Sequence, residues 1–294
     1  MEFKSLLQVF GRPWLMEESQ AMIWADYAHS LLVRKDMNAV PTMDPRTYSG
    51  AYNARAGQMY SGIYRVDSKG NMNPTGEVQV ISLDGPVMIS DYCGAPGMAV
   101  MQQVIRAANA DETVTSIVLF IDSPGGTAAG TQNLANEVKA SKKPVVAFIR
   151  NMMCSAAYWV GSSATEVILN NEVDGTNATI GSIGTKVFIM QPDPTQPKVI
   201  SITASKSSRK GKYSEEIMSG NYDRLIAELD QLNEFFLAGV KKNRGQKLRL
   251  DLENVLDGET YMGKEAIQYG LIDRMGTFEM AVKRSLQLAK TLRA

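Results

Sequence analysis

Ser155 stands where an apolar run meets a cluster of small residues, a setting in which a serine hydroxyl can become reactive. The run at residues 145–149 predicts a buried strand, and apolar residues start again at Ala156. A strand that turns directly into a helix presents one small side chain beside the N–H groups of the helix start, which favour negative charge. We therefore interpret Ser155 as a nucleophile. The alternative, a serine that caps the helix, stays open at this point.

Gly125-Gly126, after Pro124, supplies a second feature of the same chemistry. Two glycines allow the backbone to adopt positive φ and to turn its N–H groups toward a bound atom. An oxyanion forms when a hydroxyl attacks a carbonyl, and two fixed N–H donors stabilise it. A Ser-Pro-Gly-Gly sequence also occurs in ordinary tight turns, so its position one crossover before Ser155 carries the argument.

The chain has one histidine, His29, and this limits how Ser155 can be activated. His29 lies in residues 17–35, where apolar residues recur at helical spacing, so a position on a helix surface is expected. A Ser–His–Asp triad would have to recruit this distant residue, and a histidine metal site is excluded by count. We expect no metal and no cofactor, and a lysine as the base.

Composition excludes several classes of partner. The 294 residues carry 31 basic and 31 acidic side chains, so no field for binding nucleic acid is expected. No stretch approaches the ~18 continuous apolar residues of a membrane span, and the first residues lack a secretory signal pattern. The two cysteines, Cys93 and Cys154, do not form a secreted disulfide pattern, and we expect both to be reduced in a cytoplasmic protein.

Strands and helices alternate through the middle of the chain, which predicts an α/β fold with a mainly parallel sheet. The expected strands are residues 78–83, 116–121 and 145–149, and the expected helices between them are residues 98–110 and 127–140. Ligands bind beyond the carboxyl ends of the strands in such sheets. Asp84-Gly85, Gly125-Gly126 and Cys154-Ser155 follow three such ends, so we expect them to converge.

The flanking regions differ from this core in composition. Residues 38–73 are rich in Gly, Pro, Asn, Ser and Tyr without a period, which predicts a linker or extended arm. Helices are expected at residues 225–240, 263–269 and 279–292. We therefore divide the chain into three parts. They are an N-terminal helix and extended arm (1–76), an α/β catalytic core (77–212) and a C-terminal helical part that completes the domain (213–294).

Four motifs, in this order, resemble the signal peptide peptidase A family of serine peptidases. They are DSPGG at 122–126, MCSAAYW at 153–159, TIGSIG at 179–184 and GETYMGKEAIQYGLID at 258–273. The resemblance implies a Clp protease/crotonase-like fold of stacked β-β-α units and hydrolysis of peptide bonds by a Ser–Lys dyad. Ser155 matches the family nucleophile, and Gly126 and Ala156 match its oxyanion donors. The family usually has glycines after the nucleophile, where this chain has Ala156 and Ala157.

The resemblance places the lysine in a Ser/Gly-rich segment after the SIG motif, here residues 202–213. Lys210 is the choice because relatives show a similar S-x-x-K-x-x-Y arrangement, with Lys212 second and Lys206 third. The amine must be neutral, so its pKa must fall from about 10.4 through burial or nearby positive charge. In family members the lysine can come from a neighbouring protomer. Gly125 and Ser182 are expected to support the base or shape the substrate channel.

The expected function is a serine endopeptidase that acts on a peptide or protein substrate and forms a homo-oligomer. Without an expected membrane span, the chain is similar to soluble, phage- or prophage-type members that resemble capsid-maturation proteases. Two alternatives remain open. One is a catalytically inactive assembly module; the other is a crotonase-like acyl-thioester enzyme, which needs a carboxylate base and a nucleotide pocket.

Overall fold

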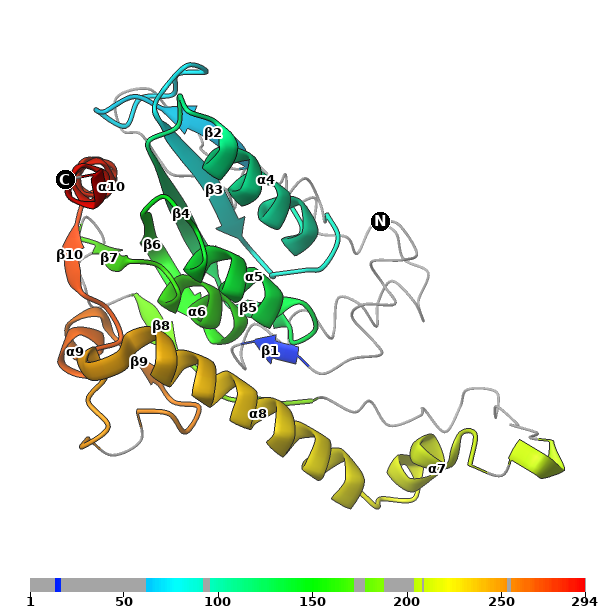
Figure 1. Cartoon of the computed structure of the whole chain (residues 1–294). Helices are drawn as coiled ribbons and strands as arrows, with labels where there is room; N and C mark the ends of the chain where they lie inside the picture. The colour runs from blue at the N-terminus through cyan, green and yellow to red at the C-terminus, as the bar shows by residue number, and fades with distance from the viewer. Residues whose placement is uncertain are drawn as a thin grey trace, which may run out of the picture.

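One mixed sheet runs through the protein, in a computed structural model that describes residues 14–16, 62–91, 96–171, 178–187, 204–207, 209–252 and 255–293. Its strand order is β10-β7-β6-β4-β3-β2, with β8 beside β6 and β9 beside β8 (Figure 1). The strands of the sheet are β2 (Ile63–Val66), β3 (Val78–Asp84), β4 (Ser116–Ser123), β6 (Val145–Cys154), β7 (Glu166–Asn170), β8 (Thr179–Gly181), β9 (Thr260–Tyr261) and β10 (Arg274–Gly276). A separate pair joins β1 (Trp14–Met16) to β5 (Gly125–Thr127).

Helices pack on both faces of this sheet. The helices of the described residues are α4 (Met98–Ala110), α5 (Thr131–Lys139), α6 (Ser155–Ser162), α7 (Lys212–Met218), α8 (Asp223–Arg244), α9 (Gly263–Gln268) and α10 (Phe278–Arg293), with 3₁₀ turns η1 (Ser205–Ser207) and η2 (Gly245–Lys247). Of these, α7 and η1 lie away from the sheet (Figure 1). Neighbouring strands from β3 through β10 along the main path are parallel, and β2 pairs antiparallel with β3. The predicted α/β class and the Clp protease/crotonase-like fold are confirmed.

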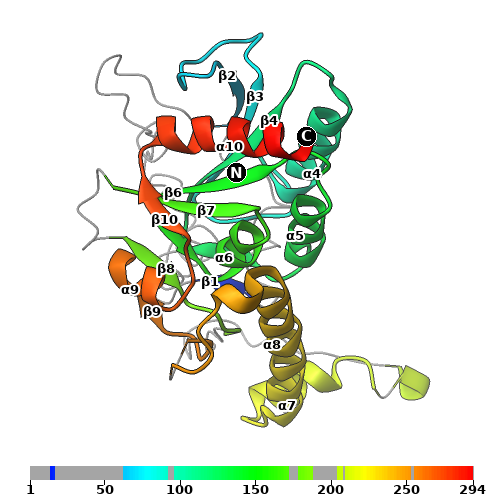
Figure 2. The same cartoon turned by 60° about the vertical axis from the view of Figure 1, so that its left-hand side comes forward.

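The strands at the centre of the sheet are buried on both faces, which explains their continuous apolar sequences. In β4, Ile117 and Leu119 face the core under α4, α5 and α6, whereas Val118 and Phe120 face α10. Figure 2 shows α10 crossing the second face of the sheet. Phe278 at the start of α10 meets Phe120 at 5.6 Å and Phe148 at 5.5 Å between ring centroids. Alternation along the strands thus produces two separate apolar layers.

Two predicted boundaries differ from the observed ones. The helix expected from residue 127 begins only at Thr131, because Gly125–Thr127 is extended and pairs with Val87 and with β1. The expected strand at 145–149 continues to Cys154, so that strand and helix meet without a connecting loop. Within the region predicted to be a linker, Ile63–Val66 forms β2, since its backbone completes the ladder of β3.

The long helix α8 packs on the hydrophobic core through its C-terminal half. Phe236 and Val240 are fully buried, and the Phe236 ring stacks on Trp159 of α6 at 5.0 Å. The other end projects from the molecule and carries α7 and η1 (Figure 1).

Several predictions fall outside the described residues. These are the N-terminal helix at 17–35 with His29, most of the arm, and Cys93. Among the residues that the structure does describe, no helix has the length and apolar character needed to cross a membrane.

Candidate active site

Ser155 lies at a sharp elbow between β6 and α6. Cys154 is extended (φ −118°, ψ 152°), and Ser155 follows at φ 52°, in the left-handed region that non-glycine residues rarely adopt. Such a conformation persists only when the surrounding structure enforces it, and it recurs at functional sites. The cap position of α6 belongs to Cys154, and no side chain makes a capping hydrogen bond there. The elbow therefore aims the serine side chain away from the strand direction.

The Ser155 hydroxyl is buried and unpaired among the described residues. The residue is 0% exposed, and its Oγ has no hydrogen-bond partner there. Ala156 is the next residue of α6, so its N–H is one of the four that an α-helix leaves without an internal partner. A buried oxygen that lacks a hydrogen-bond partner lowers the stability of the fold. The unpaired Ser155 hydroxyl therefore indicates a role other than stability.

The strand β5 presents the backbone of Gly126 on its outer edge. The N–H of Val87 donates to the Gly125 carbonyl at 2.8 Å, and the N–H of Thr127 donates to the Val87 carbonyl at 3.0 Å. Because polar groups alternate along a strand, the N–H and C=O of Gly126 face the opposite edge. A Cβ at Gly126 would lie only 2.0 Å from the Val87 carbonyl oxygen, so this position requires glycine.

Strand registers bring three distant segments to one edge of the sheet. Ile121 pairs with Ile149, but Ser123 pairs with Met153, so β6 bulges between these points. Two residues beyond the second pair, the chains reach Gly125 and Ser155.

On the other side of β6, Gly181 of β8 pairs with Cys154. The next residue is Ser182, which also has positive φ (47°), and its N–H donates to the Glu259 carbonyl at 2.7 Å. The structure thus gathers Ser155 and the two glycines at one sheet edge, as their positions after strands predicted, and Ser182 lies beside them.

The bulge in β6 also builds a charged cluster at this edge. Asn151 Nδ2 donates to Asp122 Oδ2 at 2.8 Å, and Arg150 lies 3.4 Å from the same oxygen. Asp84 pairs in register with Asp122. Burial, and then the charge of Asp122, raise the pKa of Asp84 to about 7, while Arg150 acts against the shift. Asp122 is therefore held in place by Asn151 and Arg150.

The three candidate lysines lie far from this edge within one chain. Lys206, Lys210 and Lys212 are all exposed and sit on or beside η1 and α7. Their segment lies beyond the projecting end of α8 (Figure 1). The structure does not bring any of these amines to Ser155 within a single chain.

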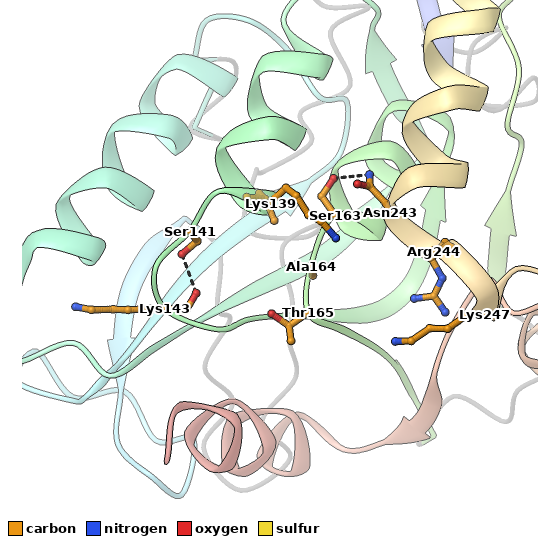
Figure 3. Close-up of a pocket in the computed structure, with 10 residues that line it drawn as sticks. Lys139, Ser141, Lys143, Ser163, Ala164, Thr165, Asn243, Arg244 and Lys247 are labelled. Carbon is orange, nitrogen blue, oxygen red and sulfur yellow. Dashed lines mark hydrogen bonds between the residues drawn. The ribbon is translucent and has the colours of Figure 1, made fainter. Parts of the chain in front are cut away.

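A hollow of about 340 Å³ lies at the opposite edge of the sheet, where β6 and β7 begin (Figure 3). Two of its basic side chains are already engaged: Arg244 donates to the Gly270 carbonyl at 2.8 Å and to Asp273, and Lys247 lies 2.7 Å from Asp273. This hollow is therefore distinct from the edge that carries Ser155.

The C-terminal motif, residues 258–273, contacts α6 and β7 and so supports the elbow at Ser155. Tyr158 of α6 donates from its hydroxyl to the Leu271 carbonyl at 2.9 Å, and Asp273 accepts from Val167 N–H and from Arg244. Burial acts to raise the pKa of Asp273, but its hydrogen bonds and the Arg244 charge hold it below the usual value. Sequence reasoning missed the parts played by Tyr158 and Val87, because each depends on a contact distant in sequence.

A parallel sheet covered on both faces, with a strained strand-to-helix serine and a glycine strand beside it, defines a Clp protease/crotonase-like α/β protein. The chain belongs to peptidase family S49, whose family model matches residues 137–292. The resemblance to signal peptide peptidase A proteins is thereby confirmed.

Relatives of known name agree with this assignment. Protease 4 of Haemophilus influenzae is 27% identical over 226 residues, which cover 74% of this chain and 35% of that protein. A Methanocaldococcus jannaschii protein named as a protease is 29% identical over 188 residues, 61% of this chain and 58% of its own length. Capsid assembly protease C of Escherichia phage lambda is 26% identical over 195 residues, with coverages of 64% and 42%. The chain thus spans between about a third and three-fifths of these relatives.

Proposed function

We propose that the protein is a serine endopeptidase with Ser155 as its nucleophile. The observation that carries this proposal is the combination of a positive-φ serine, whose buried oxygen is unpaired among the described residues, with a glycine N–H presented at the same sheet edge. Membership of peptidase family S49 supports the same activity.

In the proposed reaction, Ser155 Oγ attacks the carbonyl carbon of the scissile peptide bond while a lysine amine takes its proton. The resulting oxyanion accepts hydrogen bonds from the N–H groups of Gly126 and Ala156. As the C–N bond breaks, the lysine returns the proton to the leaving amine. Water, deprotonated by the same amine, then hydrolyses the acyl-enzyme and frees Ser155.

We propose Lys210 as this base, supplied by a second copy of the chain. Its segment lies at the far end of α8 from the core of its own chain, so it is placed to reach outward (Figure 1). Entry into the buried edge beside Ser155 would desolvate the amine and lower its pKa, as the reaction requires. Lys212 and Lys206 lie on the same projection and remain the alternates.

For the substrate, we propose a protein of a phage head. The support is the name of the lambda relative, a capsid assembly protease, together with its coverage of the Ser155 region. This step depends on similarity alone, and it concerns the substrate and not the chemistry.

A serine-directed fluorophosphonate probe tests the nucleophile. We expect Ser155→Ala to abolish both labelling and casein hydrolysis. Among Lys206→Ala, Lys210→Ala and Lys212→Ala, only Lys210→Ala should abolish turnover, with Lys241→Ala on the surface of α8 as the matched control. Persistent labelling of Ser155→Ala would contradict the nucleophile, and binding of coenzyme A would favour an acyl-thioester enzyme instead.

Mixing the two inactive variants tests delivery of the base between copies. Unfolded and refolded together, Ser155→Ala and Lys210→Ala should regain activity, because some sites would combine an intact serine with an intact lysine. A mixture that stays inactive, while each variant assembles normally, would place the base in the same chain as its serine.

A further inference from the structure

The outer edge of β5 is not empty in this structure. Residues 14–16 form β1, which pairs antiparallel with β5 so that Leu15 lies opposite Gly126 and Trp14 opposite Thr127. The same strand contacts α6, the helix that starts at Ser155. Both views show β1 at the sheet edge below α6 (Figures 1 and 2). A segment more than a hundred residues upstream in sequence therefore lies at the candidate site.

The position of this strand matters because of what Gly126 presents there. Val87 occupies the inner edge of β5, so the N–H and C=O of Gly126 face Leu15. The Gly126 N–H, which the proposed reaction needs as an oxyanion donor, thus faces the backbone of β1. An extended peptide that docks on a free strand edge forms this kind of backbone pairing.

We propose that residues 14–16 occupy the path of the substrate backbone and act as a built-in competitive inhibitor of the Ser155 site. This inference rests on the proposed peptidase function. It accounts for the complete burial of Ser155, a residue that substrate must reach. The pairing is only three residues long, so it offers few backbone hydrogen bonds and a longer substrate strand can displace it.

Proline substitution in β1 tests the pairing, because proline lacks a ladder N–H. The N–H of Leu15 faces β5, so Leu15→Pro removes a backbone donor from the pair, whereas Leu15→Ala keeps it. Met16→Pro introduces the same residue type one position out of phase, where the N–H faces away from β5. The three variants thus separate loss of pairing from the general effect of a substitution in this segment.

Two readouts are measured on the full-length chain. Hydrogen exchange followed by mass spectrometry reports the protection of the Gly126 amide, and hydrolysis of fluorogenic casein reports turnover. We expect Leu15→Pro to speed exchange at Gly126 and to raise hydrolysis about fivefold at low casein concentration, with the gain confined to KM. Leu15→Ala and Met16→Pro should behave as the unsubstituted chain does.

Unchanged exchange at Gly126 in Leu15→Pro would overturn the pairing. Faster exchange without a gain in turnover would overturn the inhibitory role. A third outcome would contradict the proposed peptidase function. In it, neither the unsubstituted chain nor any of the three variants cleaves casein or reacts with the fluorophosphonate, while exchange at Gly126 still responds to Leu15→Pro. The inhibitory role would then fall with it, although the pairing itself would stand.

Discussion

At the scale of single residues, the molecule accepts conformational strain at Ser155. A left-handed conformation costs a non-glycine residue about 1–2 kcal/mol, whereas glycine adopts it freely. Glycine would nevertheless remove the hydroxyl that we propose as the nucleophile. We conclude that the strained elbow serves to position the Ser155 hydroxyl at the expense of stability, a trade-off commonly found at active sites.

This strain gives a prediction about two inactive variants. Ser155→Gly and Ser155→Ala both remove the hydroxyl, and activity should fall at least ~1000-fold in each. Ser155→Gly should nevertheless be the more stable by about 0.5–1 kcal/mol in urea unfolding, since only alanine keeps the strained Cβ. Ala107, exposed inside α4, provides the control: there glycine should be less stable than alanine by about 1 kcal/mol. The same order at both sites would contradict strain at Ser155.

Asp84 gives a prediction about pH. Its pKa is raised from 3.8 to about 7 by burial and by Asp122, so between these values the folded state binds more protons than the unfolded state. The contribution of Asp84 to the stability of the fold is therefore fully present below about pH 4 and is lost as the pH rises through 7. Asp84→Asn removes the charge, so its melting temperature relative to the unsubstituted chain should rise by about 2–5 °C between pH 5 and pH 8.5.

Asp67 provides a control of opposite sign. Slight burial acts to raise its pKa, but hydrogen bonds from the N–H groups of Asn71 and Lys69 hold it below the ordinary value. Its contribution is present at neutral pH and is lost as the pH falls through that lowered pKa. Asp67→Asn should therefore be less stable than the unsubstituted chain at pH 7, and the difference in stability should shrink in acid. Parallel pH trends in the two variants would contradict the assignment to Asp84.

At the scale of elements, the elbow is held by the contact between α6 and α8. Trp159 stacks on Phe236 with an angle of 13° between the rings. Gly239 of α8 allows this approach, because a Cβ there would lie 2.4 Å from Trp159 Nε1. Glycine is a poor residue for a helix interior, so its presence reflects the space that the indole needs.

Gly239→Ala should therefore destabilise the protein although alanine favours helix. Overpacking costs about 1–3 kcal/mol against a propensity gain of about 1 kcal/mol, so a net loss of up to about 2 kcal/mol is expected in urea unfolding. In a Trp159→Phe background the smaller ring leaves room, and the same substitution should cost clearly less. Equal costs in both backgrounds would show that Gly239 and Trp159 are not coupled.

Elements also show how much the sequence could predict. The strands at β3, β4 and β6 and the helix α4 followed from apolar runs and helical periodicity, which depend on neighbours in the chain. The extended Gly125–Thr127 did not, since its partners Val87 and β1 are distant. Of the candidate site, the convergence of Ser155 with the two glycines at one sheet edge was predictable, because both segments directly follow strands of the sheet. The position of the lysines was not predictable, since it depends on where α8 leaves the core.

At the scale of the whole molecule, the projecting end of the structure carries apolar side chains as well as the lysines. Met218 of α7, Tyr222 between the helices and Ile226 of α8 are between 39% and 74% exposed. Such side chains are unusual on a projection unless another surface covers it. The second copy of the chain that we propose as the source of the lysine would supply that surface.

Ile226→Glu should therefore lower the mass measured under native conditions toward that of one chain and reduce turnover in proportion. Gln231→Glu places the same charge on an exposed part of α8 away from Ile226, and should leave both properties unchanged. Retained assembly in Ile226→Glu would show that copies meet elsewhere.

The helix α10 has a consequence for how the polypeptide emerges during synthesis. It alone among the described helices covers the layer formed by Val118, Phe120, Val146 and Phe148, and its own residues begin at Phe278. A nascent chain stopped before that point leaves these aromatic and branched side chains exposed to water. Ribosome-bound intermediates that end before Phe278 should bind hydrophobic dyes and chaperones, and this binding should cease once α10 has left the exit tunnel.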